Sequence, residues 1–172
     1  MKSIVIYSSL TGNTKQVAEA ITSVLPADTP CVSISELPSD MESYDLVFAG
    51  FWVDKGTANK AARDVLGTLH NPYIALFATA GVPPQMAHAK ESLINAANCL
   101  PDGVEPVGTF ICQGKVDPKV IEMMYKMFPK GHSHGQSADR DARHKQAAVH
   151  PNEDDFKAAQ DFAQHILAKL DR

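Results

Sequence analysis

Apolar residues along the chain form short uninterrupted runs that alternate with longer runs at helical spacing. The runs lie at residues 4–7, 31–34, 46–49, 73–78 and 106–112; those at 4–7 and 46–49 are apolar throughout, whereas those at 31–34 and 106–112 include Ser33 and Thr109. Runs that are apolar throughout are typical of strands buried on both faces, as in a parallel sheet covered by helices. The sequence therefore predicts five strands, most of them fully buried.

The segments between these runs carry apolar residues at intervals of three and four, which is the pattern of amphipathic helices. Such patterns lie at residues 17–25, 58–69, 86–97, 118–128 and 152–170. Pro83-Pro84, Asp117-Pro118 and Asn152 supply the start signals of the last three helices. Alternation of strand and helix predicts an α/β fold with a parallel sheet.

Length and composition agree with one domain that has a full core, since the chain has 172 residues and 44% hydrophobic residues. The apolar run at 4–7 is too short for a signal peptide, and no segment is long enough to cross a bilayer. Cys31, Cys99 and Cys112 show neither CxxC nor zinc spacing. We therefore expect a cytoplasmic protein without a membrane segment, disulfides or a bound metal.

The net charge of −4 argues against a dedicated nucleic-acid binder. Its distribution is uneven, because residues 113–150 hold seven Lys/Arg and four Asp/Glu, a local charge of +3, which leaves −7 elsewhere. A basic segment on an acidic body indicates either a docking face for a partner or a solvated loop.

The stretch from Ser8 to Thr14 separates the first strand from the first helix and has the chemistry of a phosphate loop. Hydroxyl side chains and a glycine at a helix N-terminus direct donors and the positive end of the helix dipole at one point. Neither G-x-x-x-x-G-K-[ST] nor G-x-G-x-x-G is present. Because the loop carries no Lys or Arg before Lys15, neutral donors would hold the anion, which suits a phosphate monoester.

Ser9-Leu10-Thr11-Gly12-Asn13-Thr14 matches the pattern T/S-x-T-G-x-T and, in its strand-loop-helix setting, resembles the FMN-phosphate loop of flavodoxins. The resemblance covers residues 1–112 and the last helix. It implies a doubly wound five-stranded parallel sheet of order 2-1-3-4-5 in a single domain, 1–172, with an insertion at about 113–150. The alternation alone also allows a response-regulator order, which Ser8-Ser9 and Gly50-Phe51 disfavour because a receiver domain needs acidic residues there.

Ligands of such sheets sit beyond the carboxyl ends of the strands at the topological switch point. The residues that the resemblance implies for FMN binding are Ser9, Leu10, Thr11, Gly12, Asn13, Thr14, Phe51, Trp52, Val53, Asp54, Lys55, Gly56, Thr79, Ala80 and Gly81. Among them, Trp52 is expected to contact the flavin ring, whereas Phe51 suits the core. The family also implies that a glycine peptide, best matched by Gly56, bonds flavin N5. Lys55 departs from the acidic or neutral residues that the family usually has there.

The loop at 79–83 lacks the tyrosine that electron-shuttle flavodoxins commonly stack on the outer flavin face. That face is therefore expected either to be open to a nicotinamide, quinone or other small-molecule electron acceptor, or to be covered by the segment after the fifth strand.

Residues 113–150 form a connection longer than a compact domain normally needs, and such segments usually carry function or are disordered. We expect an amphipathic helix at 118–128 and an exposed short helix at 139–145. His132 and His134 have H-x-H spacing without evident further ligands, so this stretch is read as a solvated loop.

No general acid or base is evident in the sequence, so any chemistry would belong to the cofactor. The favoured function is an FMN-binding electron carrier that serves a redox partner protein, because the charge asymmetry fits docking and no Arg cluster marks a dinucleotide site. The alternatives are an NAD(P)H- or quinone-dependent FMN reductase and a flavodoxin-like domain that binds no flavin.

Overall fold

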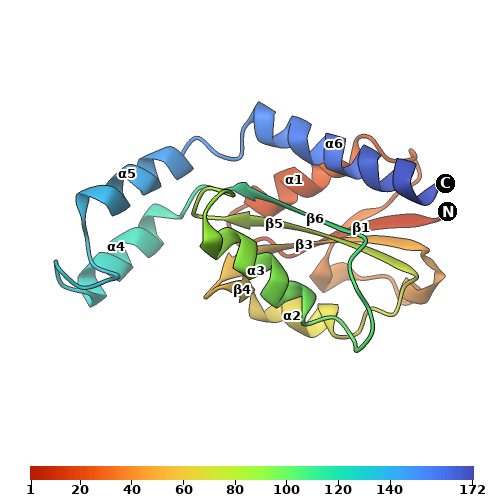
Figure 1. Cartoon of the computed structure of the whole chain (residues 1–172), viewed down its shortest axis with the longest axis horizontal. Coiled ribbons are helices and arrows are strands. Elements are labelled where there is room, and N and C mark those ends of the chain that lie inside the picture. Colours follow the sequence, from red (N-terminus) through yellow and green to blue (C-terminus); the bar gives the residue numbers. More distant parts are fainter.

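A parallel sheet forms the centre of the computed structural model, which describes residues 1–172 (Figure 1). Its strands are β1 (Ser3–Tyr7), β2 (Cys31–Ser33), β3 (Leu46–Asp54), β5 (Tyr73–Ala80) and β6 (Gly108–Gln113). They are arranged as β2-β1-β3-β5-β6, which is the order 2-1-3-4-5 when only the parallel strands are counted. The doubly wound α/β sheet predicted from the sequence is confirmed.

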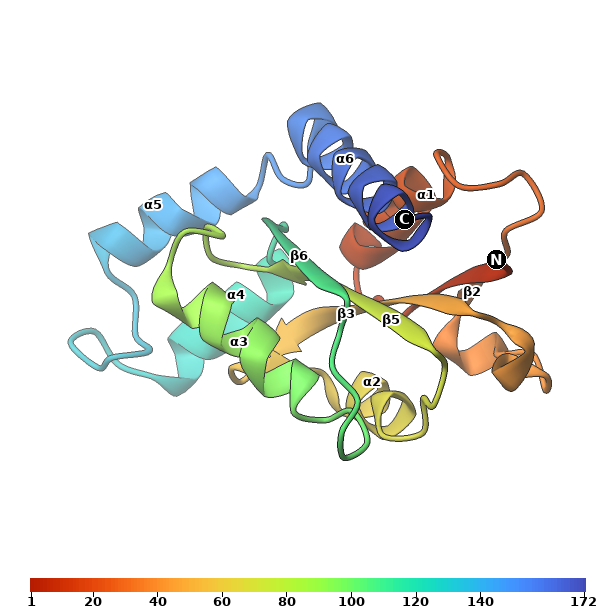
Figure 2. The same cartoon turned by 45° about the vertical axis from the view of Figure 1, so that its right-hand side comes forward.

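Helices cover both faces of the sheet (Figure 2). On one face lie α1 (Asn13–Thr22) and α6 (Glu153–Leu170), and on the other lie α2 (Lys60–Leu66) and α3 (Ala87–Ala97). Successive side chains of a strand point to opposite faces, so Ile4 and Ile6 enter one core cluster and Val5 enters the other. Burial on both faces explains why the strands are apolar throughout.

The third strand is longer than the sequence indicates. The apolar run in the sequence ends at residue 49, but residues 50–54 continue β3 because Gly50 pairs with Phe77 and Trp52 with Thr79. A Cβ atom at Gly50 would lie 2.1 Å from Cζ of Phe77, so only glycine leaves room for that ring. The strand then turns through Lys55 and Gly56, with φ of 50° and 78°, into the short antiparallel β4 (Thr57–Ala58).

The helix after β5 begins later than expected. Pro83-Pro84 is a helix-start signal, but α3 begins at Ala87, and a turn from Pro83 to Met86 precedes it. The residue before a proline is driven away from helical geometry, so Val82 and Pro83 stay outside the helix. Two short 3-10 helices, η1 (Ile34–Glu36) and η2 (Met41–Ser43), connect β2 to β3.

The segment between β6 and α6 is largely helical and extends away from the sheet (Figure 1). It contains α4 (Pro118–Met127) and α5 (Ala138–Ala147), and we call residues 116–149 the arm. The two helices are joined by Tyr125, whose hydroxyl donates to Oδ1 of Asp141 at 3.0 Å and lies 3.1 Å from Nδ1 of His144. The rings of His132 and His134 lie against Phe128, with centroid distances of 4.7 and 5.4 Å.

The last helix begins where the sequence predicts. The side chain of Asn152 accepts hydrogen bonds from the backbone N–H groups of Asp154 and Asp155, and the Asp155 carboxylate accepts one from the backbone of Asn152. This capping box satisfies donors that the helix itself leaves without acceptors. No helix of the structure combines the length and apolar character needed to cross a membrane.

Candidate functional site

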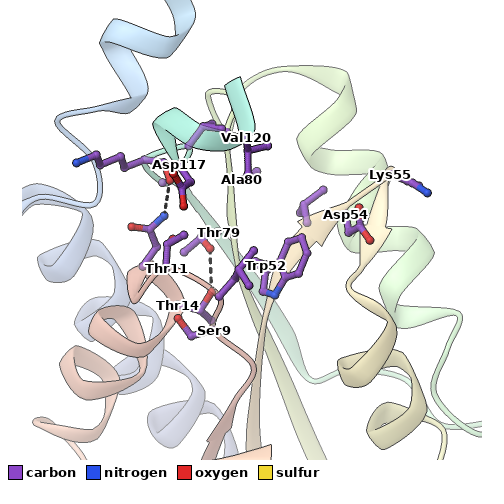
Figure 3. A pocket seen from close by; sticks show the side chains of 17 residues that line it. Ser9, Thr11, Thr14, Trp52, Asp54, Lys55, Thr79, Ala80, Asp117 and Val120 are labelled. Carbon is purple, nitrogen blue, oxygen red and sulfur yellow. Dashed lines mark hydrogen bonds between the residues drawn. The ribbon is translucent and has the colours of Figure 1, made fainter. Parts of the chain in front are cut away.

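A cavity of about 260 Å³ lies at the carboxyl ends of β1, β3 and β5 (Figure 3). Its lining residues are Ser9, Leu10, Thr11, Asn13, Thr14, Trp52, Val53, Asp54, Lys55, Thr79, Ala80, Gly81, Gly114, Lys115, Val116, Asp117 and Val120. The cavity therefore occupies the switch point of the sheet, where open α/β folds bind their ligands.

The first wall of the cavity is the loop that leads into α1. Gly12 is the N-cap residue with φ of 94°, and it offers no side-chain cap to the helix. Ser9 holds the loop, because its Oγ accepts hydrogen bonds from the backbone N–H groups of Gly12 at 3.1 Å and Lys15 at 3.4 Å. The first N–H groups of any helix lack intrahelical acceptors, and here no acidic residue lies in the first turn. This end of α1 therefore suits an anion.

Two threonines of this loop differ in environment. Thr11 is exposed at the cavity, whereas Thr14 is 1% exposed and its Oγ1 lies 2.9 Å from Oγ1 of Thr79. In such a pair one hydroxyl donates to the other, so one hydroxyl hydrogen remains free for another acceptor. The pair joins the loop to β5 and leaves one donor at the cavity floor.

The opposite wall comes from the extension of β3. Trp52 is half-buried and lies across the cavity from Thr11 (Figure 3). Its carbonyl accepts a hydrogen bond of 3.1 Å from the backbone of Asn59, whose side chain donates in turn to Oγ of Ser8 at 2.8 Å. Buried Asn59 therefore holds the tryptophan strand and the phosphate-type loop at a fixed separation.

Most of the residues expected at the site from the sequence line this one cavity, but three of them do not. Phe51 is fully buried in the core, as its apolar character suggested. Gly12 contributes to the loop without lining the cavity. Gly56 lies in the turn between β3 and β4, and its carbonyl accepts a hydrogen bond of 2.8 Å from Asn95 of α3.

The segment after β6 was one of two alternatives that the sequence offered for the outer flavin face, and it supplies lining residues that the sequence did not single out. They are Gly114, Lys115, Val116, Asp117 and Val120. The one local signal in this stretch was the helix start at Asp117-Pro118, which fixes the first turn of α4 through a 2.8 Å bond from the Lys119 N–H to the Asp117 carboxylate.

The ionisable lining residues are two acids, Asp54 and Asp117, and two bases, Lys55 and Lys115. No histidine, cysteine or tyrosine lines the cavity. The nearby Cys112 is 2% exposed, and burial raises the pKa of its thiol to about 12, so it does not supply a thiolate near neutral pH. The site therefore offers binding groups rather than an acid-base or nucleophilic pair.

Comparison with known proteins identifies the family of the chain. A family model described as flavodoxin domain matches residues 4–164. The flavodoxin-like domain-containing protein BilS of Clostridioides difficile is 36% identical over 176 residues, a match that covers 98% of each chain.

Two solved structures share the fold at lower sequence identity. A flavodoxin of Streptococcus pneumoniae has a TM-score of 0.58 and 14% identity, with 98% of this chain and 99% of that chain covered. A flavoprotein of Lactobacillus acidophilus in complex with FMN has a TM-score of 0.52 and 19% identity, with 64% of this chain and 93% of that chain covered. The family model spans nearly the whole chain, so this chain belongs to the flavodoxin family.

Proposed function

We propose that this chain binds FMN in the cavity between α1 and Trp52 and that it passes electrons to a redox partner protein. The observation that carries the proposal is the division of one cavity into two chemically different ends. One end has hydroxyls and the N-terminus of α1, and the other has an indole ring and aliphatic side chains. FMN has the same division, with a phosphate at one end and an apolar planar ring at the other.

The donor set fits a phosphate monoester. Its groups are the hydroxyls of Ser9, Thr11 and Thr14 together with the first turn of α1. Lys15, the nearest cation in sequence, is exposed, and its Nζ lies 3.9 Å from Oε1 of Glu19 on the same helix. A single phosphate held by neutral donors and a helix dipole is an established arrangement.

The ring end fits an aromatic ligand. Trp52 offers an aromatic face, and Val53, Ala80, Val116 and Val120 offer aliphatic surface. Burial of a flat apolar ring against such side chains is favourable at about 25 cal/mol per Å². The solved L. acidophilus flavoprotein, which shares this fold, contains FMN and supports the choice of ligand.

Bound FMN supplies one-electron and two-electron chemistry, while the chain holds the cofactor and limits access to it. The lining carries no acid-base pair that would mark a substrate reaction. Beside the cavity mouth, α4 exposes Val120, Met123 and Met127, with Lys119 nearby and Lys126 paired with Glu122 at 2.8 Å. Adaptable methionines, together with the net charge of +3 of residues 113–150, suit transient contact with a protein that presents acidic side chains.

The reductase alternative depends on the lack of an aromatic residue at 79–83, which would leave the outer ring face open to a small molecule. In the structure this region is not empty, because Val116 lies against Gly81. We therefore favour the electron carrier.

Spectroscopy and turnover test the proposal together. Purified protein that has been incubated with FMN and then desalted is expected to retain a flavin absorbance band at about 450 nm. The loaded protein alone is expected to consume NAD(P)H negligibly with a quinone present. Loss of all FMN on desalting would refute the cofactor, and steady NAD(P)H turnover without a partner would replace the carrier with the reductase.

A further inference from the structure

The segment that leaves β6 follows the rim of the cavity before α4 begins. The backbone N–H of Gly114 donates to the carbonyl of Ala80 at 2.7 Å, which extends the pairing of β6 with β5. Gln113, buried beside it, donates from its side chain to the carbonyl of Gly81 at 3.4 Å. The segment is therefore attached to the loop in which the sequence lacks an aromatic residue.

Close packing fixes the segment on both sides. A Cβ atom at Gly81 would lie 2.7 Å from Cγ2 of Val116, so Val116 fills the space that a side chain at position 81 would need. A Cβ atom at Gly114 would lie 2.8 Å from Nδ2 of Asn13. Glycine at both positions lets the segment pass between the phosphate loop and β5.

Hydrogen bonds connect this passage to the phosphate loop and to the far end of the arm. Nδ2 of Asn13 donates to the carbonyl of Lys115 at 2.8 Å, across 102 positions of sequence. The backbone N–H of Lys115 donates to the carbonyl of His150 at 2.8 Å, which joins the two ends of the arm. The arm is therefore closed at its base, directly beside the cavity.

The first turn of α4 then directs one more aliphatic side chain to the cavity. Asp117 caps the helix, and Val120 lines the cavity near Ala80 (Figure 3). Val120 is still 45% exposed, so part of its surface is available for burial by a ligand.

We propose that Val116 and Val120 form the outer wall of the flavin site, on the side where residues 79–83 provide no aromatic ring. This inference rests on the proposed function, because it assigns residues to the ring of the same cofactor. An aliphatic wall stabilises the bound ring only through the apolar surface that it removes from water, without the additional stacking energy of an aromatic pair. The cofactor and the arm are consequently coupled, since binding of the ring covers the first turn of α4.

Alanine replacements at the two positions test the wall directly. Calorimetric titration would compare Val116→Ala and Val120→Ala with the wild type, using FMN and riboflavin as separate ligands. Each variant is expected to bind both ligands about five- to fifteenfold more weakly, because two methyl groups leave the ring contact. The loss should be the same factor for both ligands, since the phosphate is not involved.

Val149→Ala is the matched control, because Val149 lies at the end of the arm and is 64% exposed. This variant is expected to bind both ligands like the wild type. Thermal unfolding followed by circular dichroism would verify that all three variants fold.

A second readout does not depend on affinity. Trypsin cleavage after Lys119 requires local opening of α4, and a ligand that contacts the first turn slows such opening. Saturating FMN is expected to slow this cleavage in the wild type several-fold and to slow it less in Val120→Ala. Unchanged cleavage on FMN addition would overturn the inference.

The outcomes separate this inference from the proposed function. If the wild type binds neither FMN nor riboflavin, the proposed function and the proposed wall fail together. If the wild type binds FMN and both variants bind it equally well, only the wall is wrong. A loss of affinity for FMN alone would place the segment at the phosphate. An equal loss of affinity in Val149→Ala would show a general effect of the arm. Either result would overturn the assignment of Val116 and Val120 to the outer wall.

Discussion

Replacing Thr11 by valine removes one hydroxyl from the phosphate loop while keeping the size of the side chain. Thr11 is exposed at the cavity, so the change leaves the core intact. A hydrogen bond to a charged group is worth about 1.5–3 kcal/mol. The dissociation constant for FMN should therefore rise about 10- to 150-fold, whereas that for riboflavin, which has no phosphate, should stay unchanged.

Thr14→Val has a second consequence that must be separated from binding. The hydroxyl of Thr14 is paired with that of Thr79 at 2.9 Å, and both residues are buried. Valine at position 14 leaves the Thr79 hydroxyl without its partner, which lowers the free energy of unfolding by about 1–3 kcal/mol. Thr79→Val is the matched control, because it breaks the same pair and keeps the hydroxyl in the loop.

Calorimetric titration with FMN and riboflavin, combined with urea unfolding of each variant, measures both effects. Thr14→Val and Thr79→Val should lose similar stability, but only Thr14→Val should lose affinity selectively for FMN. The double variant Thr11→Val/Thr14→Val should lose about two orders of magnitude or more in FMN affinity. Equal losses for FMN and riboflavin in the Thr11 variant would refute the assignment of the phosphate to this loop.

Three further predictions concern stability and reactivity. Asn152→Ala removes the capping box of α6 and should lower the free energy of unfolding by about 0.5–2 kcal/mol, measured by urea denaturation. Burial raises the pKa of the Cys112 thiol to about 12, so Cys112 should resist a thiol reagent in the folded protein while the half-buried Cys99 reacts. Rapid labelling of Cys112 would contradict its burial. Burial lowers the pKa of His144 below its ordinary value, so the unfolded chain takes up a proton first as the pH falls. Its contribution to stability should be complete above about pH 6.5 and decrease below that pH. His144→Gln should therefore reduce the pH dependence of thermal unfolding, and an identical dependence in the variant would refute this role.

The fold was predictable from the sequence where burial imposes a local pattern. Residues 4–7 and 46–49 are covered on both faces, so their apolar character alone identifies them as strands. The continuation of β3 was not predictable, because Gly50 and the charged pair Asp54-Lys55 resemble a loop. The requirement for glycine at position 50 comes from Phe77 on the neighbouring strand, which is a contact between distant parts of the chain.

In the candidate site, too, one part was predictable from local sequence and another part was not. The place of the loop at Ser8–Thr14 beside the cavity was predictable, because its hydroxyls, its glycine and the helix that follows form one continuous stretch. The passage of residues 114–117 over the cavity was not, because it depends on the contact of Val116 with Gly81 and on the bond from Asn13 to Lys115. The sequence indicated α4 as an amphipathic helix and allowed its segment to cover the flavin face, but it did not identify which apolar residues would reach the cavity.

Binding of FMN next to Trp52 is the central claim, and the single tryptophan of the chain makes it directly measurable. Titration of the flavin-free protein with FMN, followed by tryptophan fluorescence, should give strong and saturable quenching with a stoichiometry of one to one. Removal of the flavin should restore the emission, because the indole ring lies in the wall of the cavity. Unchanged tryptophan emission, in a protein shown by absorbance to retain FMN, would place the flavin away from Trp52 and contradict the account.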